Sequence, residues 1–166
     1  SVKMGEFRIE LTKNPKAKPI DETALGFGKI MTDHMFIMDY SVTKGWHDAR
    51  IIPYGPIELD PANTSLHYGQ LAFEGMKAYR TEDGSIQLFR PRKNIERFNQ
   101  SNARLSMPKL DVEFVVKAIA KLVEIDRDWV PSASGTSLYI RPFIFSDDAF
   151  LGVAPSSKYK FISKLK

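Results

Sequence analysis

The sequence predicts a single domain of the α+β or mixed α/β class. Short β-prone segments occupy its first part and its end, and two amphipathic helices are expected between them, which is an order typical of this class. The length of 166 residues is enough for one domain with its own core. A hydrophobic fraction of 43% and a charged fraction of 27% are those of an ordinary globular protein.

The first part of the chain contains the expected strands. Residues 7–11 alternate polar and apolar side chains and predict a short strand, and the apolar, β-prone residues 30–40 predict a second one. Residues 45–61 contain three prolines and two glycines, which favour a long ordered loop. Asn63 or Ser65 can then cap a short helix that runs to about residue 72.

The middle of the chain predicts a hairpin followed by a helix. Apolar residues 76–79 and 86–89 flank a loop that contains Asp-Gly, and this pattern favours a β-hairpin. Pro91 suits the first turn of a helix, which is expected to run to about residue 103.

The second half gives the clearest prediction. In residues 111–125 apolar side chains recur at three- and four-residue spacing, and Asp111 can serve as the N-cap of a helix. Residues 138–145 are apolar on both faces, which predicts a strand in the centre of its sheet.

Charge and composition exclude several classes of function. The four lysines of residues 151–166 account for the whole formal net charge of +4, so we interpret them as a solvated tail or an artefact of the terminus and expect no nucleic-acid partner. The chain has no cysteine and no apolar run of membrane-spanning length. No signal peptide is visible in its first residues, and the cytoplasm is the expected location.

The chain contains few motifs of catalytic chemistry. His34, His47 and His67 are scattered and lack the spacing of a metal site, so no metal is expected. The sequence shows no glycine-rich phosphate loop and no nucleophile elbow. The adjacent acids Asp147 and Asp148 fit a solvated loop or a cap better than a catalytic pair.

Arg141 is the most informative single residue. It lies within the apolar run 138–145, where a guanidinium must be paired or must face a cavity, because an unpaired buried charge is strongly unfavourable. Tyr139 projects from the same face of the strand, and a phenol beside a guanidinium suits a carboxylate ligand. An ion pair between Arg141 and an internal acid such as Glu74 explains the residue equally well.

Other candidate residues favour structural roles when taken singly. Arg97 lies opposite the core side of its helix, where an arginine is usually solvated. Tyr68 and Phe73 are core residues by default. Phe27 lies between two glycines, which is a plausible place for the lip of a pocket.

A set of segments in a fixed order identifies a family. They are Phe27-Gly28, Thr32-Asp-His-Met35, Leu66-His-Tyr68, Phe73-Glu-Gly75, Arg97, Trp129-Val-Pro131, Ser137-Leu-Tyr-Ile-Arg-Pro142 and Leu151-Gly-Val153. From about residue 26 to about residue 155, the chain resembles branched-chain amino-acid aminotransferases, which are pyridoxal-phosphate enzymes of fold type IV. The resemblance implies the small amino-terminal domain of that fold, with a mostly antiparallel sheet flanked by helices.

The resemblance implies roles for three polar residues. Arg97 would bind the phosphate of pyridoxal phosphate. Tyr139 and Arg141 would line the substrate site, with Arg141 reading the distal carboxylate of glutamate or 2-oxoglutarate.

It also implies an apolar wall for branched-chain amino acids. Phe27, Tyr68 and Phe73 would surround the side chain of leucine, isoleucine or valine. Tyr68, Leu151 and Val153 would reach into the pocket of a neighbouring subunit, so a homodimer is expected.

The family's remaining machinery is not in these residues. Its Schiff-base lysine and the acid that pairs with the pyridine nitrogen belong to a second, carboxy-terminal domain. We therefore expect no catalytic residue in the segment, no pyridoxal phosphate bound to it and no activity from it.

The chain divides into three expected regions. Residues 1–20 would form a strand and a connector rich in proline and lysine, and residues 21–155 the aminotransferase domain. Residues 156–166 depart from the family, which continues there as an apolar strand, and this lysine-rich end is interpreted as a truncation, a frameshift or an artificial boundary.

Two other functions remain open at this point. The chain would act as a non-catalytic domain that binds a carboxylate or a partner protein, or as part of a related fold type IV enzyme with another amino donor. A downstream reading frame that encodes the lysine domain distinguishes an aminotransferase from the non-catalytic domain. Substrate profiling of the complete enzyme distinguishes a branched-chain aminotransferase from a related enzyme with another amino donor.

Overall fold

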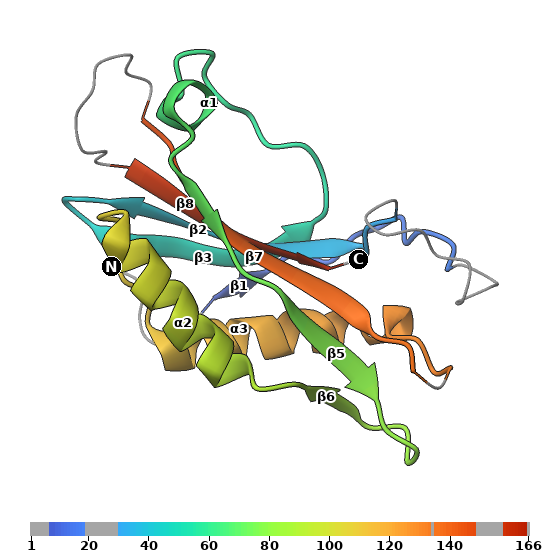
Figure 1. Cartoon of the computed structure of the whole chain (residues 1–166). Helices are drawn as coiled ribbons and strands as arrows, with labels where there is room; N and C mark the ends of the chain where they lie inside the picture. The colour runs from blue at the N-terminus through green and yellow to red at the C-terminus, as the bar shows by residue number, and fades with distance from the viewer. Residues whose placement is uncertain (1–6, 19–29, 134, 149–157, 166) are drawn as a thin grey trace.

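The computed structural model describes residues 7–18, 30–133, 135–148 and 158–165, whose arrangement is shown in Figure 1. Helices α2 and α3 lie together against one face of a sheet. The elements in chain order are β1 (Arg8–Ile9), β2 (His34–Ser41), β3 (Gly45–Pro53), α1 (Thr64–Tyr68), β4 (Leu71–Phe73), β5 (Met76–Arg80), β6 (Ile86–Leu88), α2 (Pro91–Arg104), α3 (Val112–Ile125), the 3-10 helix η1 (Arg127–Trp129), β7 (Leu138–Ser146) and β8 (Lys158–Leu165).

The strands of the described residues form one sheet in the order β1-β3-β2-β8-β7-β5-β6, and β4 pairs with β7 beside this path. The pair of β1 and β3 is parallel, and the other pairs are antiparallel. Strand β7 lies between β8 and β5, as predicted for residues 138–145. The mostly antiparallel sheet flanked by helices is therefore confirmed.

The main core lies between the sheet and the two long helices. Helix α3 begins after Asp111, whose carboxylate accepts a hydrogen bond of 2.7 Å from the N–H of Phe114, as the sequence predicts. Its apolar stripe packs on the sheet through large side chains that are shielded from water. The largest fully buried ones in this core are Phe36, Phe98, Phe161, Met38, Ile51, Ile95, Leu110, Ile119, Leu122, Ile140 and Ile144.

The opposite face of the sheet is covered only in part by the described residues. Ile57 and Leu59 pack against a small cluster there, which consists of Met35, Ile37, Phe145 and Ile162. Beside this cluster, Leu71 and Phe73 of β4 are 46% and 59% exposed. This face therefore keeps an open, partly apolar region next to β7.

The expectation of a long loop over residues 45–61 is wrong for residues 45–53 and holds for residues 54–61. Residues 45–53 form β3, which pairs with β2, and the prolines lie at and beyond the end of the strand. The pairing of β2 with β3 is irregular between Ile37 and Asp39. Such a bulge interrupts the two-residue alternation that would have marked the pair in the sequence.

The helix predicted after Asn63 is shorter than expected. The Asn63 side chain accepts the N–H of Ser65 (2.9 Å), which confirms it as the N-cap, but the helix ends at Gly69, whose φ of 64° suits glycine. The residues up to Phe73 then extend and pair with β7 as β4.

The lysines near the end of the chain are not a solvated tail. Residues 158–165 form β8 between β2 and β7, and Tyr159 and Phe161 point into the main core. Lys160 forms ion pairs with Asp39 (2.8 Å) and Asp147 (3.2 Å). Burial lowers the pKa of Lys160, but these two acids more than offset it, so that its pKa is raised. The alternation of lysine with aromatic residues at positions 158–161 is that of a strand with one charged face and one apolar face.

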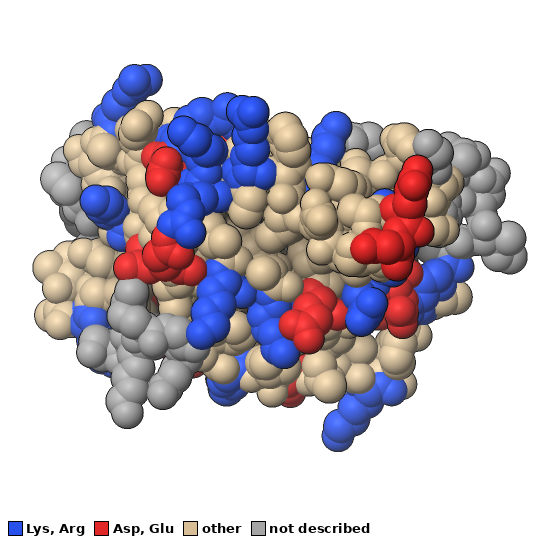
Figure 2. Space-filling view, turned by 90° about the horizontal axis from the view of Figure 1, so that it is seen from below, with Lys and Arg blue, Asp and Glu red and all other residues tan. Residues whose placement is uncertain are grey.

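The surface over the helices carries charges of both signs. Figure 2 shows acidic side chains lying among the basic ones on this side of the molecule. Arg92 of α2, for example, donates to Glu113 of α3 at 3.1 Å. Within the described residues, no helix has the length and apolar character needed to cross a membrane.

Candidate functional site

The two candidate residues of β7 lie on the sheet face away from α2 and α3. Their neighbours Leu138, Ile140 and Ile144 are buried in the main core, whereas Tyr139 and Arg141 are partly exposed on the other side. The Nε–H of Arg141 donates a hydrogen bond of 3.0 Å to the hydroxyl of Tyr139. The two side chains therefore share one face and touch, as their spacing predicts.

Aromatic rings surround the guanidinium of Arg141. Its Cζ atom lies 4.4 Å from the ring centroid of Phe73 and 5.2 Å from that of Tyr139. A cation within about 6 Å of a ring face is attracted by the ring quadrupole. Within the described residues, no carboxylate forms an ion pair with Arg141, so the alternative of a pair with Glu74 is wrong.

Glu74 instead pairs with Arg97 of α2. Arg97 Nε donates to Glu74 at 3.0 Å, and a second nitrogen of the same guanidinium contacts the other carboxylate oxygen. The hydrogen bond and the charge of Glu74 raise the pKa of Arg97. The Glu74 side chain is only 12% exposed, while that of Arg97 is 64% exposed. Arg97 therefore presents a fixed cationic edge to solvent.

Gly75 lies between the Glu74–Arg97 ion pair and the ring of Tyr139. Its N–H donates to Glu74 (3.1 Å), and its carbonyl accepts from Asn94 of α2 (3.0 Å). A Cβ atom at this position would lie 3.1 Å from two ring carbons of Tyr139 and closer still to its hydroxyl. Glycine is needed here because the Tyr139 ring lies directly on the backbone.

The structure thus brings four predicted residues into one region, and the remaining ones do not all fall within it. Phe73, Tyr139 and Arg141 are in contact, and Arg97 joins them through Glu74. Tyr68 lies on α1, is 52% exposed and has a ring contact with His67. Phe27, Leu151 and Val153 lie outside the described residues.

Sequence reasoning missed the parts played by Glu74 and Gly75. Both belong to the segment Phe73-Glu-Gly75, which marks the family without indicating a role for either residue. The pairing of Glu74 with Arg97 joins residues 23 positions apart, and no local pattern announces it. The close approach of Tyr139 to Gly75 depends likewise on the pairing of β5 with β7.

The donors present fit a phosphate better than a metal ion. A solvent-exposed guanidinium offers several N–H donors to an anion, and the Arg97 side chain is 64% exposed although it pairs with Glu74. The ion pair with Glu74 holds this guanidinium near Gly75 and Tyr139. No group of His, Cys, Asp or Glu suited to a metal ion occurs in the part of the chain that the structure describes.

Known proteins of one kind are similar to this chain in sequence. No protein-family model matches the chain. It is 57% identical over 155 residues to branched-chain-amino-acid aminotransferase 2 of Bacillus subtilis (strain 168), covering 93% of this chain and 42% of that protein. Over 153 residues it is 54% identical to branched-chain-amino-acid transaminase 1 of the same strain, covering 92% and 43%.

Solved structures show the same fold. The branched-chain amino acid aminotransferase from Escherichia coli superposes with a TM-score of 0.60 at 24% identity, over 80% of this chain and 40% of that one. The branched-chain amino acid aminotransferase from Thermobaculum terrenum, in its PLP-form, gives 0.54 at 21% identity, over 78% and 39%. The chain spans about two fifths of the length of the relatives it matches. By sequence and by fold, it is therefore the counterpart of the amino-terminal part of branched-chain amino-acid aminotransferases of fold type IV.

Proposed function

We propose that this chain is the substrate-facing domain of an enzyme that moves an amino group between leucine, isoleucine or valine and 2-oxoglutarate. The observation that carries the proposal is the guanidinium of Arg141, which lies on Phe73, bonds to Tyr139 and has no carboxylate partner within the described residues. A complete enzyme would add a carboxy-terminal domain and a second subunit. Its substrates are water-soluble metabolites, and we place the enzyme in the cytoplasm.

The site combines the two chemistries that such an enzyme needs. A branched aliphatic side chain gains roughly 0.8 kcal/mol for each methylene that leaves water, and Phe73 offers it an exposed ring. A glutamate side chain entering the same pocket needs a cation to replace its water, and the Arg141 guanidinium lies over that ring. Tyr139 fixes the guanidinium through its hydroxyl. Phe27 and Tyr68 would complete the apolar wall, and Leu151 and Val153 of each subunit would reach the other's pocket.

Arg97 is the residue that would hold the phosphate of pyridoxal phosphate. When bound, this cofactor supplies an electron sink for the reacting carbon. Glu74 orients the Arg97 guanidinium. The Glu74 side chain is itself held in place, because it is only 12% exposed. The phosphate would bind the nitrogen edge that Glu74 leaves exposed.

A second candidate function rests on the exposed apolar surface near α1 and β4. Leu66, Tyr68, Leu71 and Phe73 are each 46% or more exposed. A non-catalytic domain that binds a partner protein would use such a surface. In a complete aminotransferase, the same surface would contact the second subunit.

Substrate profiling separates these functions. The chain is expressed together with the coding sequence that follows it, and the product is assayed with 2-oxoglutarate and each of leucine, isoleucine, valine, alanine and D-alanine. We expect turnover with the three branched-chain donors and little with the other two. Turnover confined to D-alanine would indicate a related fold type IV enzyme, and a product without transaminase activity would favour the binding domain.

A further inference from the structure

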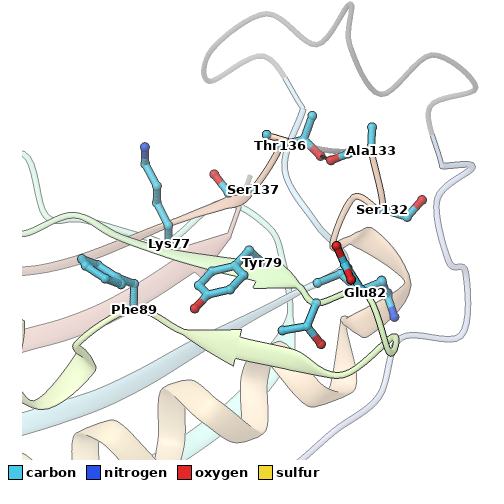
Figure 3. A pocket seen from close by; sticks show the side chains of 11 residues that line it. Lys77, Tyr79, Glu82, Phe89, Ser132, Ala133, Thr136 and Ser137 are labelled. Atoms are coloured by element: carbon cyan, nitrogen blue, oxygen red, sulfur yellow. Dashed lines mark hydrogen bonds between the residues drawn. The ribbon is translucent and has the colours of Figure 1, made fainter.

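A hollow lined partly by β5 lies next to the Tyr139–Arg141 pair of β7. It has a volume of about 520 Å³ and is lined by residues of the β5–β6 hairpin, by Phe89 and by residues 132, 133 and 135–137, which precede β7 (Figure 3). Lys77 of β5 is the cross-strand partner of Tyr139. Directly opposed residues share one sheet face, so the floor of the hollow continues the face that carries the candidate site.

The end of the hollow near Lys77 is cationic. Lys77 is exposed, and within the described residues no acid forms an ion pair with it. The other cation of the lining, Arg80, donates to the carbonyl oxygens of Arg127 (2.7 Å) and Val130 (3.3 Å), which fix it without neutralising it. Glu82 also lines the hollow, but Figure 3 shows it toward the opposite end from Lys77.

Two aromatic rings form the wall next to this cation. The N–H of Phe89, the residue directly after β6, donates to the carbonyl of Lys77 on β5 at 3.2 Å, which holds the two residues next to each other. The rings of Phe89 and Tyr79 lie side by side below the Lys77 side chain in Figure 3. The Arg90 guanidinium lies over the Phe89 ring, 5.3 Å from its centroid, and Phe89 is still 58% exposed, so the ring keeps apolar surface for a ligand.

Hydroxyl groups lie on the other wall. Ser132, Thr136 and Ser137 all line the hollow. Thr136 uses its hydroxyl to bond the carbonyl of Ala133, whereas the Ser137 side chain lies on the side of Lys77 in Figure 3. A hydroxyl and an ammonium at one end are hydrogen-bond donors suited to a small anion.

We propose that this hollow binds an aromatic carboxylate, with the carboxylate at Lys77 and Ser137 and the ring against Phe89 and Tyr79. Its size lies in the range of small-molecule sites, and an apolar wall with a few convergent polar groups is their usual composition. The proposal is independent of the proposed function, because Lys77 and Phe89 have no part in the carboxylate site at Arg141.

The test uses the 166-residue chain and benzoate as the probe. Benzoate is titrated into isotopically labelled protein, and amide and side-chain shifts are followed by NMR, with benzyl alcohol as the neutral analogue. We expect saturable shifts at Lys77, Tyr79, Phe89 and Ser137. Lys77→Gln should weaken benzoate binding by about tenfold or more, since it removes a charge-assisted hydrogen bond. Lys93→Gln, an exposed lysine on α2, is the matched control and should leave the affinity unchanged.

Three results would overturn the assignment. Benzoate would cause no saturable shift, or benzyl alcohol would bind as tightly, or the shifts would centre on Tyr139 and disappear in Arg141→Gln while persisting in Lys77→Gln. The last result would move the anion to the carboxylate site and leave the proposed aminotransferase function standing. Binding that persists in Arg141→Gln and is lost in Lys77→Gln supports the separate site.

Discussion

Gly75→Ala tests the contact between the Tyr139 ring and the backbone beneath it. The added Cβ would lie 3.1 Å from two ring carbons and closer to the hydroxyl, so the ring must move and the hydrogen bond to Arg141 is lost. A hydrogen bond to a charged group contributes about 1.5–3 kcal/mol, and partial exposure of both partners reduces this to about 1–2 kcal/mol. The expected loss of unfolding free energy is of that size.

The sign of the effect makes this test sharp. A protein is normally stabilised by about 0.4–1 kcal/mol when alanine replaces a glycine whose backbone suits it, because the unfolded chain becomes less flexible. Gly55→Ala is the matched control, since nothing lies within 4 Å of its added Cβ. In a Tyr139→Ala background, where no ring meets the new methyl group, Gly75→Ala should also become neutral or stabilising.

Urea unfolding of these variants, followed by circular dichroism, gives the free energies. If Gly75→Ala stabilises the wild-type background as much as Gly55→Ala does, the ring does not lie on Gly75, and the described geometry of the site is refuted.

Three further outcomes follow from the structure. Phe161→Ala should cost about 3–5 kcal/mol in urea unfolding because the ring is fully buried, whereas Lys158→Ala in the same strand should cost little, and equal small losses would contradict a core role for β8. Burial raises the pKa of Asp33, but hydrogen bonds from Lys16 and Trp129 and the charges of Lys18 and Lys16 together outweigh it and lower the pKa below 3.8. The stabilising effect of Asp33 is therefore present above that pH and is lost as the pH falls through the lowered pKa. In urea unfolding, Asp33→Asn should cost about 1–3 kcal/mol at pH 7 and progressively less below about pH 4, and a pH-independent difference would be inconsistent with this. Incubation of the 166-residue chain with pyridoxal phosphate and borohydride should label no single lysine stoichiometrically, and mass spectrometry that found one such lysine together with turnover would contradict the proposal that the reactive lysine belongs to another domain.

The sequence predicted those features whose signals are local. Helix α3 was foreseen because Asp111 and the apolar spacing lie within one short stretch of the chain. Strands β3 and β8 were missed because the evidence for them lies in other parts of the chain. Strand β3 is paired irregularly with β2, and Lys160 of β8 forms ion pairs with Asp39 and Asp147, which lie outside β8.

The site follows the same division. The shared face of Tyr139 and Arg141 was predictable from the two-residue period of a strand. Whether Arg141 pairs with Glu74 was undecidable from the sequence, because Arg97 competes for that carboxylate from a helix 23 residues away. Only the fold shows that Glu74 pairs with Arg97, while the Arg141 guanidinium lies over the ring of Phe73.

The selectivity of Arg141→Ala in the complete enzyme tests the central claim most directly. The kcat/KM for glutamate should fall by about 10- to 150-fold, since its side-chain carboxylate loses a charge-assisted hydrogen bond, while that for leucine should change little. Arg141→Lys keeps the charge but loses the planar fork of donors, so it should restore only part of the glutamate activity. Equal losses for glutamate and leucine would show that Arg141 supports the fold of the site and does not read the carboxylate.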